Sequence, residues 1–179
     1  MFSLTSPPGS AELKIGVGTA APLSTAKRAL LALKAGDELT ATTVGGDFIP
    51  PRTPGAPVLL IAAGIGITPY LSQLSGNAAD RDVVLLYLAK NAGELAYAEE
   101  LERTGVRVIA RLGDGSVPPA FMQDAGASRI DGASLKVLVP DVAAREVYVS
   151  GSPASVRSLR AAARRAGARK IHVDSFSGY

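Results

Sequence analysis

Two glycines and a threonine follow the most apolar run of the chain. The stretch "VLLIAAGIGITPY" (residues 58 to 70) holds six apolar residues, then Gly64 and Gly66, then Thr68 and Pro69. A buried strand that ends in glycines and enters a helix favours an anion such as a pyrophosphate. We expect the glycines to remove Cβ atoms that would hold the anion away. We expect Thr68 to cap the helix and Pro69 to occupy its first turn. The stretch alone also fits a tight turn that needs positive φ angles.

The elements that must position this turn alternate between strand and helix. Runs rich in Val, Ile and Leu are typical of strands buried on both faces of a parallel sheet, and they occur at residues 57–63, 82–89, 106–112, 146–150 and 170–176. Crossover helices are expected between them, at 68–75, 93–104, either 118–126 or 132–139, and 153–167. The pattern predicts an α/β fold with a doubly wound, parallel, five-stranded sheet.

The first third of the chain has a different texture. The segment 49–57, "IPPRTPGAP", has four prolines in nine residues, which indicates a linker or a domain boundary. Before it we expect a short strand in 10–18, a short helix in 24–36 that stops at Gly36, and a half-buried strand in 37–46. We therefore divide the chain into residues 1–53 and 54–179.

Composition limits the chemistry. The 179 residues include no cysteine, which excludes disulfides, thiolate zinc sites and cysteine-held iron–sulfur clusters, so any redox chemistry must be organic. No apolar run approaches the roughly 18 residues of a membrane span. The N-terminus lacks the pattern of a secretory signal, which predicts a cytoplasmic protein. The net charge of +3 is concentrated in residues 156–170, too locally to indicate a nucleic-acid-binding protein.

The stretch "LLIAAGIGITPYLSQL" closely resembles the pyridine-nucleotide motif of the ferredoxin–NAD(P)H reductase superfamily, in which a flavin-binding barrel precedes a nucleotide-binding α/β domain. Further stretches match in the same order. "FSLTSPP" resembles the flavin-binding strand, and "LSTAKRALLALKAGDEL" the flavin-pyrophosphate segment. "GGDF" resembles the barrel exit, "VYVSGSP" the Cys-Gly-Pro motif, and "IHVDSFSGY" the aromatic C-terminus. The resemblance spans almost the whole chain and implies FAD and NAD(P)H as cofactors.

Two departures from the family pattern concern the flavin side. A barrel of typical domain size takes roughly a hundred residues, and about half of that precedes the linker. Residues 1–53 are thus expected to be the C-terminal remnant of an antiparallel barrel. The arginine of the family's flavin motif would fall immediately before Met1. Three explanations remain, in order of preference: the chain is a piece of a longer reductase, a fused or separate partner completes its barrel, or it binds flavin poorly.

The resemblance implies roles for residues of the flavin side. Phe2 would lie along the flavin, Ser3 would donate a hydrogen bond to it, and Leu4 continues the same strand. Ser24 and Thr25 would cradle the flavin pyrophosphate. The alternative for Ser24 is a helix N-cap, which is favoured if the resemblance is set aside.

On the nucleotide side, the resemblance implies that Gly64, Ile65, Gly66, Thr68 and Pro69 receive the pyrophosphate and the nicotinamide ribose, with the hydroxyl of Thr68 near the nicotinamide ring. The residue just past a second strand commonly reads the adenosine 2′ position. Lys90 and Asn91 stand there instead of an acid, which slightly favours NADPH because lysine can meet a 2′-phosphate. The alternative for Lys90 is a solvated loop residue.

The end of the fourth expected strand matches a second part of the motif. Gly151 permits close approach of a ligand, Pro153 starts a helix, and Ser152 or Ser150 stands in for the missing cysteine. The aromatic residues Phe176 and Tyr179 are candidates to cover the flavin ring, and Phe176 is equally well explained as a core residue.

The resemblance implies a flavin-dependent NAD(P)H oxidoreductase, or its nucleotide-binding half, in which Thr68, Ser152 and Tyr179 lie nearest to the reaction, with no metal. The chain would position the nicotinamide against the flavin, and the cofactors would carry the chemistry. Arg157, Arg160 and Arg164 form one helix stripe, either a solvated face or a docking face for an acidic ferredoxin or flavodoxin. The alternatives are a non-catalytic nucleotide-binding or regulatory module and an unrelated doubly wound enzyme.

Overall fold

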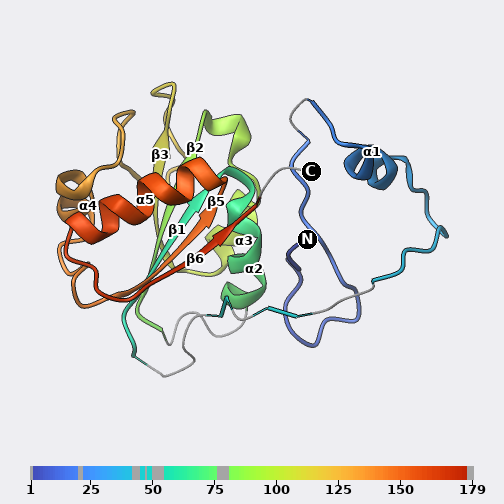
Figure 1. Cartoon of the computed structure of the whole chain (residues 1–179), viewed down its shortest axis with the longest axis horizontal. Helices are drawn as coiled ribbons and strands as arrows, with labels where there is room; N and C mark the ends of the chain where they lie inside the picture. Colours follow the sequence, from blue (N-terminus) through green and yellow to red (C-terminus); the bar gives the residue numbers. More distant parts are fainter. Residues whose placement is uncertain are drawn as a thin grey trace.

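The computed structural model describes residues 2–19, 22–41, 45–46, 48–49, 55–75 and 81–176. Six parallel strands form one sheet in the order β4-β3-β2-β1-β5-β6 (Figure 1). The strands are β1 (Val58–Ala63), β2 (Val83–Ala89), β3 (Arg107–Leu112), β4 (Gln123–Asp124), β5 (Glu146–Gly151) and β6 (Ile171–Ser175).

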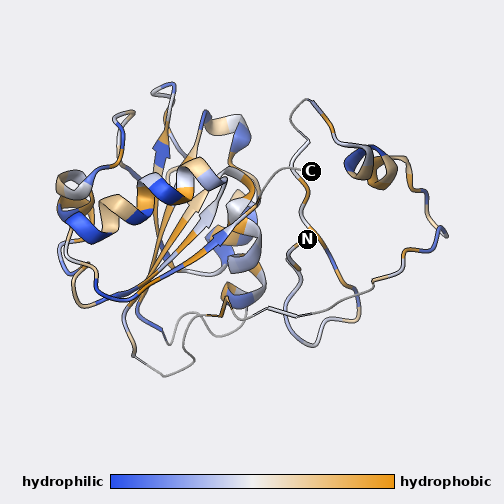
Figure 2. Ribbon diagram, in the orientation of Figure 1, coloured by the Kyte–Doolittle hydropathy of each residue, from blue (hydrophilic) through white to orange (hydrophobic). Residues whose placement is uncertain are grey.

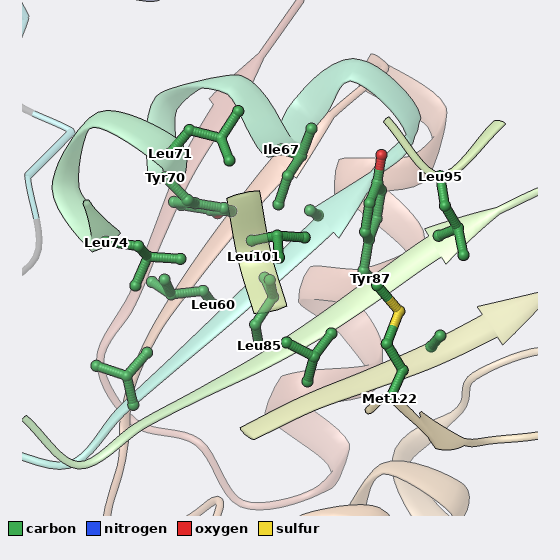
Figure 3. Close-up of a cluster of buried hydrophobic side chains, with 14 of the residues drawn as sticks. Leu60, Ile67, Tyr70, Leu71, Leu74, Leu85, Tyr87, Leu95, Leu101 and Met122 are labelled. Atoms are coloured by element: carbon green, nitrogen blue, oxygen red, sulfur yellow. The ribbon is translucent and has the colours of Figure 1, made fainter. Parts of the chain in front are cut away.

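Helices cover both faces of the sheet. On one face, α2 (Thr68–Leu74) and α3 (Ala98–Arg103) pack onto β1 and β2, and Figure 3 shows Tyr70, Leu71 and Leu74 of α2 pointing onto Leu60 and Leu85. On the other face, α4 (Gly132–Leu138) and α5 (Pro153–Arg165) bury their apolar residues against the opposite side chains of the same strands. Within the described ranges, no helix combines the length and the apolar character that crossing a bilayer would need.

The predicted doubly wound α/β fold is confirmed, with one correction to the strand count. All five expected strands form, and β1, β2 and β5 are almost entirely buried, as their continuous apolar runs predicted. The expectation of burial on both faces is wrong for β6, which has no buried residue because it is an edge strand. The sixth strand, β4, lies in the segment 118–126 that was one of two candidates for a crossover helix. β4 has only two residues and both are exposed, so it has no apolar pattern to reveal it. The crossover helix is α4 instead.

The N-terminal part contains one helix and one bridge. Helix α1 (Thr25–Ala32) begins after Ser24, as expected, but ends at Ala32, four residues before the stop expected at Gly36. The strand expected in 10–18 is reduced to an antiparallel bridge between Leu4 and Ile15. The strand expected in 37–46 does not form in its described residues, and residues 42–44 lie outside the described ranges. Strands need partners to satisfy their backbone groups, and the described residues before β1 supply almost none.

Apolar side chains of this N-terminal part are exposed. Helix α1 has no buried residue, and the buried apolar core of the described chain begins only at Val58. Eight of the eleven large hydrophobic residues that are exposed in the described chain lie in residues 2–49: Phe2, Leu4, Leu13, Ile15, Leu31, Leu33, Leu39 and Ile49. Figure 2 shows hydrophobic segments in orange along this part of the ribbon. The residues of this part that the structure describes thus form no hydrophobic core of their own.

One aromatic residue fastens the N-terminal part to the α/β domain. The ring of Phe48 lies 5.8 Å from that of Tyr70 and 5.4 Å from that of Tyr148, measured between centroids. The side-chain amide of Gln73 donates a hydrogen bond to the Phe48 carbonyl oxygen at 3.1 Å. The predicted barrel exit "GGDF" therefore ends in an anchor on α2 and β5.

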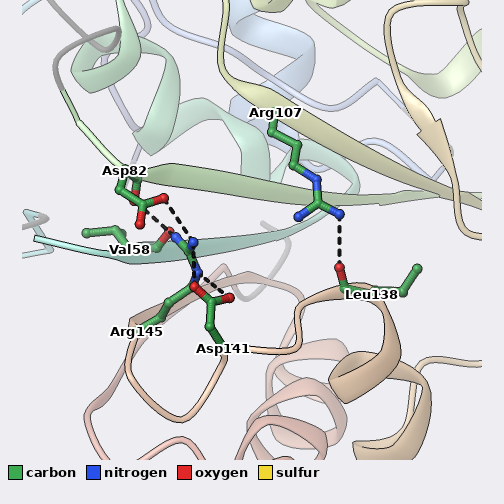
Figure 4. A network of polar contacts seen from close by, with 6 residues as sticks. All are labelled: Val58, Asp82, Arg107, Leu138, Asp141 and Arg145. Atoms are coloured by element: carbon green, nitrogen blue, oxygen red, sulfur yellow. Dashed lines mark hydrogen bonds and ion pairs between the residues drawn. The ribbon is translucent and has the colours of Figure 1, made fainter. Parts of the chain in front are cut away.

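The buried Arg145 links three chain segments at the end of the sheet where the strands begin (Figure 4). The guanidinium of Arg145 is 7% exposed and donates to the carbonyl oxygens of Val58 and Asp82, at 3.2 and 3.1 Å. It also pairs with the carboxylates of Asp82 and Asp141, at 2.9 and 2.8 Å. Arg145 stabilises the starts of β1, β2 and β5 because it satisfies backbone and charged groups from all three segments.

Candidate functional site

The candidate site lies where the strand order reverses. β1 has β2 on one side and β5 on the other, so successive connections leave β1 toward opposite halves of the sheet. Ligands of open parallel sheets bind beside the carboxyl ends of the strands at such a reversal. Four segments emerge at this edge: residues 64–67 after β1, 90–91 after β2, 151–153 after β5, and 176 after β6. The predicted nucleotide-side residues thus follow strands that end at one edge.

The two glycines of the first turn have different roles. Residues Gly64–Ile67 form a 3₁₀ turn, and Gly64 has a φ of +56°, a conformation that favours glycine. A Cβ atom on Gly64 would meet open space. A Cβ atom on Gly66 would lie 2.3 Å from the carbonyl oxygen of Ser150 and 2.8 Å from the Cα atom of Gly151. The expectation that both glycines clear space for a pyrophosphate is therefore wrong for Gly66, which faces β5.

The end of β5 packs against the end of β1 in the same way. Gly151 has a φ of +153°, and a Cβ atom on it would lie 2.9 Å from the Cβ atom of Ala63. Gly66 approaches β5 while Gly151 approaches β1, so glycines on both segments allow the close contact. The ends of β1 and β5 are consequently packed backbone on backbone. We call the edge where residues 64–67, 151–153 and 176 emerge beside this contact the crevice, and its shape depends on these two glycines.

Thr68 does not cap α2 as expected. The N-cap position is occupied by Ile67, and the Thr68 hydroxyl donates a hydrogen bond back to the carbonyl oxygen of Ile65 at 3.0 Å. The side chain is 2% exposed. The reason is the 3₁₀ turn, which places Thr68 inside the helix rather than before it. Pro69 lies in the first helical turn, as predicted.

Two serines at the end of β5 differ in their hydrogen bonds. Ser152 is the N-cap of α5; its hydroxyl oxygen accepts from the Ser155 amide at 3.2 Å and lies 2.9 Å from the Ser155 hydroxyl. Pro153 begins this helix, as predicted. Ser150 is fully buried, and its hydroxyl has no hydrogen-bond partner among the described residues. A buried polar group without a partner calls for an explanation such as a bound ligand. Of the two serines, Ser150 thus has the hydroxyl without a partner, and Ser152 has the hydroxyl that is engaged in the helix cap.

Two further polar residues, Asp174 and Tyr70, lie on this part of the sheet, and no motif indicated them. Asp174 of β6 pairs with Ser150 in the sheet register, and alternation places Ser150 on the same face as Tyr148, which is the face that α2 covers. The Tyr70 hydroxyl donates to the carbonyl oxygen of Ile61 at 3.3 Å. Burial, followed by the charge of Asp174, raises the pKa of Tyr70 well above its ordinary value. Ser150 and Asp174 are neighbours only because of the register between β5 and β6, which the sequence does not reveal.

The N-terminal segment lies against the turn after β1. A Cβ atom on Gly16 would lie 2.3 Å from Cγ2 of Thr68 and 2.7 Å from the hydroxyl of Tyr97, and one on Gly18 would contact Ile65. Burial and the charge of Glu100 raise the pKa of Tyr97, while a hydrogen bond with Thr5 acts in the opposite direction. Residues expected on the flavin side thus meet residues expected on the nucleotide side.

Tyr97 adopts a conformation that bulky residues avoid. Its φ is +63°, and it is the one described residue other than glycine with a positive φ. Strain of this kind costs about 1–3 kcal/mol and persists where surrounding contacts impose it. Here the contacts are those with Thr5 and Gly16. Nothing in the spacing of "GELAYAEELERT" signalled this role.

The predicted flavin-side residues fall into two groups. The first group is Phe2, Ser3 and Leu4. Leu4 forms an antiparallel bridge with Ile15, the neighbour of Gly16, and therefore lies next to the segment that contacts the turn after β1. Ser24 and Thr25 lie at the start of α1, which Figure 1 shows apart from the sheet. The Ser24 hydroxyl accepts from the Lys27 amide at 3.3 Å, so Ser24 is an N-cap, as its alternative interpretation stated. The structure does not bring this second group to the crevice.

The residues after β2 are engaged in local contacts. The Lys90 side chain is 80% exposed, and its ammonium lies 3.8 Å from a carboxylate oxygen of Glu94. The Asn91 side chain accepts a hydrogen bond from the Glu94 amide at 3.1 Å and caps the short 3₁₀ turn Ala92–Glu94. An exposed pair of this length contributes at most about 1 kcal/mol, so Lys90 can leave Glu94 at little cost.

The C-terminal aromatic Phe176 reaches the same edge. Its backbone amide donates to the carbonyl oxygen of Gly151 at 2.9 Å, and its side chain is half-buried. Tyr179, the other predicted aromatic, lies outside the described residues.

Comparisons with known proteins agree with this architecture. No protein-family model matches the chain. It is 26% identical over 154 residues to a flavohemoprotein of Bacillus subtilis, covering 80% of this chain and 38% of that protein. It superposes on a cytochrome P450 reductase of Amycolatopsis with a TM-score of 0.69 and 26% identity, covering 98% of this chain and 59% of that one. Ferredoxin-NADP+ reductase of Plasmodium falciparum gives a TM-score of 0.71 and 15% identity, covering 98% of this chain and 76% of that one. The chain thus spans less than half of the flavohemoprotein it matches.

Proposed function

We propose that this chain, which has the fold of the ferredoxin–NAD(P)H reductase superfamily, binds NAD(P)H at its β1–β5 crevice and serves in a flavin-dependent NAD(P)H oxidoreductase. The observation that supports the proposal best is the crevice itself. Gly66 and Gly151 hold the ends of β1 and β5 together at the strand reversal, and Gly16 and Tyr97 close on the same turn. A flavin-side segment therefore touches the turn that would hold the nucleotide.

Each proposed role follows from a position at this edge. Gly64 and Ile65 would offer backbone to the pyrophosphate, because the Cβ side of Gly64 is open. Gly151, Ser152 and Pro153 would bound the nicotinamide end, with Phe176 beside them. Ser150 would provide its unpaired hydroxyl. Thr68 acts through its methyl contact with Gly16, because its hydroxyl is bonded within the turn.

The cofactors, when bound, supply hydride transfer between their own rings. The contribution of the chain is position and the exclusion of water. The contact of Gly16 with Thr68 and Tyr97 supports both contributions. It fixes the flavin-side segment against the turn, and it leaves no room for water between the two. No side-chain acid or base is required by this division of labour.

The flavin half needs more structure than the described residues provide. We propose that residues 1–53 are the last part of a flavin-binding barrel and that residues 54–179 bind the nucleotide. Phe2, Ser3, Leu4, Ser24 and Thr25 would join the flavin site once further strands cover the exposed apolar face of residues 2–49. An upstream segment of the same polypeptide, or a fused or separate partner, would supply those strands.

The electron acceptor is proposed by class. The similar proteins are named flavohemoprotein, cytochrome P450 reductase and ferredoxin-NADP+ reductase, and these names support a haem protein or a ferredoxin as the class of acceptor. The second candidate is a non-catalytic nucleotide-binding module, which the exposed apolar face favours because an incomplete barrel would hold flavin weakly.

Glycine substitutions test the nucleotide site. Gly64→Leu would place a side chain in the open space at the proposed pyrophosphate site, and Gly105→Leu introduces similar strain away from it, because Gly105 has a φ of +67° and open space. We expect NADPH affinity, measured by calorimetry, to fall at least tenfold in Gly64→Leu and to stay within twofold in Gly105→Leu. Equal affinities in the two variants would refute the site.

Visible spectroscopy then separates the two functions. A yellow FAD complex that NADPH bleaches under anaerobic conditions supports the oxidoreductase. The same test is made on a protein that includes the further barrel strands proposed to cover the exposed apolar face. If that protein binds NADPH and shows no FAD spectrum, the result supports the non-catalytic module.

A further inference from the structure

Tyr97 stands at a position that is unfavourable for a tyrosine in two ways. It occupies the N-cap position of α3, yet its side chain forms no cap hydrogen bond. Its φ of +63° and ψ of 27° are left-handed, whereas a typical N-cap residue is extended and is Ser, Thr, Asp or Asn. The needs of α3 therefore do not explain Tyr97, and its contacts outside this helix must compensate for the strain.

The chain on both sides of Tyr97 is fixed to the α/β domain. Leu95 and Leu101 are buried in the core on the α2 face of the sheet (Figure 3). The Leu101 amide also donates to the Tyr97 carbonyl oxygen at 3.0 Å. Because the core holds its neighbours, the backbone conformation of Tyr97 decides where its phenol ring points. A change in φ at this residue would move the ring.

Tyr97 contacts the segment of residues 2–18, which we call the docked segment. A Cβ atom on Gly16 would lie 2.7 Å from the Tyr97 hydroxyl, and the Thr5 side chain forms a hydrogen bond with the same hydroxyl. Of residues 2–18, only Ser6 and Gly16 are buried. A segment with so few buried residues opens at low free-energy cost, so its position depends on its few contacts with the α/β domain.

The docked segment also contacts the turn after β1 and the residue that follows it. A Cβ atom on Gly16 would lie 2.3 Å from Cγ2 of Thr68, and one on Gly18 would lie 3.7 Å from Ile65. Gly16 is thus enclosed between Thr68 and Tyr97. Tyr97 therefore holds the docked segment from the side opposite to the turn.

We propose that Tyr97 is a positioning residue, a strained latch that holds the docked segment against the turn after β1. In the docked state its contacts with Thr5 and Gly16 compensate for the left-handed conformation. When the segment leaves, these contacts are lost and Tyr97 relaxes to a negative φ, so the latch has two states. The proposal rests on the proposed function, in which the docked segment belongs to the flavin side and the turn holds the nucleotide.

The latch couples the two cofactor sides. A nucleotide bound at the turn would fix Ile65 and Thr68, against which the docked segment packs. These contacts exist only in the docked state, so they supply the difference in affinity that a shift between two states requires. The nucleotide therefore favours docking, and by reciprocity docking favours nucleotide binding by the same factor.

Amide hydrogen exchange of the full chain tests the latch. The Thr5 amide, which donates to the Lys14 carbonyl oxygen at 2.8 Å, reports on the docked segment, and the Leu60 amide in β1 reports on the core. Tyr97→Gly removes both the phenol ring and the strain, because glycine adopts a positive φ freely. We expect the Thr5 amide to exchange at least tenfold faster in this variant and the Leu60 rate to change less than threefold. Tyr97→Phe, which loses only the hydroxyl contacts, should give an intermediate Thr5 rate.

Two glycine variants provide a matched pair. Gly16→Ala puts a methyl group into the tight contact, whereas Gly18→Ala makes an ordinary van der Waals contact. We expect Gly16→Ala to raise the Thr5 rate at least tenfold and Gly18→Ala to raise it less than threefold. The double variant Tyr97→Gly/Gly16→Ala should exchange within threefold of the faster single variant, because both changes release one latch. Independent structural effects would multiply instead.

The latch is overturned if Tyr97→Gly changes the Thr5 rate less than threefold or raises the Leu60 rate equally. It is also overturned if the two glycine variants act alike. Saturating NADPH should slow Thr5 exchange at least threefold in the wild type and not in Tyr97→Gly. NADPH that binds the wild type in calorimetry without slowing Thr5 exchange overturns the coupling. Absence of NADPH binding overturns the proposed function and the coupling with it, while the exchange rates without nucleotide still decide on the latch.

Discussion

Gly66 lies so close to Ser150 that a Cβ atom on the glycine would stand 2.3 Å from the serine carbonyl oxygen. The contact is with backbone, which cannot swing away as a flexible side chain can. The two residues belong to segments that the sheet order brings together at the strand reversal. The shape of the crevice therefore depends on the absence of one methyl group.

Gly66→Ala is expected to lower the free energy of unfolding by about 1–3 kcal/mol, because overpacking forces the turn away from β5. Gly64→Ala is the control, since its Cβ atom meets open space and only the conformational cost of roughly 1 kcal/mol remains. Urea unfolding followed by circular dichroism measures both. If Gly66→Ala were as stable as the wild type, the close packing described for the ends of β1 and β5 would be incorrect.

Ser152→Ala should lower stability, whereas Ser150→Ala should not. Ser150→Ala removes a buried hydroxyl that has no partner, so the free energy of unfolding should stay the same or rise by up to about 1 kcal/mol. Ser152→Ala removes the N-cap of α5 and should lower it by about 1 kcal/mol. Thermal unfolding compares the two. A clear loss of stability in Ser150→Ala would mean that its hydroxyl has a partner within the protein.

The contrast between these serines shows what sequence could and could not predict. The strands were predictable because continuous apolar runs such as residues 58–62 fit only a strand buried on both faces. The assignment of the polar role to Ser152 depended on spacing from the motif alone. The register of β5 with β6 places Asp174 beside Ser150 and determines which groups can reach the Ser150 hydroxyl, which has no hydrogen-bond partner among the described residues. Residues far apart in the chain decide such features, and local pattern has no access to them.

The same distinction explains the errors at the first turn. Glycine and proline correctly marked the turn and the helix start around residues 64–69. Sequence could not reveal the 3₁₀ turn that moves Thr68 into the helix, or that Gly66 faces β5 instead of a ligand. The contacts of Gly16 and Tyr97 were missed because they join the two expected domains.

Lys90 gives a prediction on coenzyme preference. If Lys90 meets the adenosine 2′-phosphate, Lys90→Ala should weaken NADPH binding roughly five- to tenfold and leave NADH binding unchanged. Glu94→Gln should strengthen NADPH binding slightly, because it removes the carboxylate that lies 3.8 Å from the Lys90 ammonium. Calorimetric titration with both coenzymes measures the ratio. Equal losses for NADPH and NADH would place Lys90 away from the 2′ position.

The Arg145 network predicts how stability depends on pH. Hydrogen bonding to Arg145, together with its charge, lowers the pKa of Asp141 below its ordinary value in the folded chain. A lowered folded pKa means that the stabilising effect is fully present above the ordinary carboxyl pKa of about 4, and is lost as the pH falls through the lower folded value. Asp141→Asn should therefore reduce the Tm at pH 7.

Measured at several pH values, the Tm difference between the wild type and Asp141→Asn should shrink as the pH falls from 5 toward 2. Asp114→Asn is a useful comparison, because the pKa of Asp114 is lowered by its bonds to Ser116, at an exposed turn, and not by a buried arginine. A Tm difference for Asp141→Asn that is independent of pH would show that the ion pair does not stabilise the fold.

The exposed N-terminal part predicts where proteases act first. Regions with few buried contacts open at low free-energy cost, and helix α1 has no buried residue. Limited trypsin digestion should therefore cut at Lys27, Arg28 or Lys34 well before it cuts in α5, although α5 has more arginines. Mass spectrometry of the first fragments identifies the sites. Covering the apolar face by further barrel strands should slow the early cuts, whereas early cleavage within α5 would contradict the stability assigned to the α/β domain.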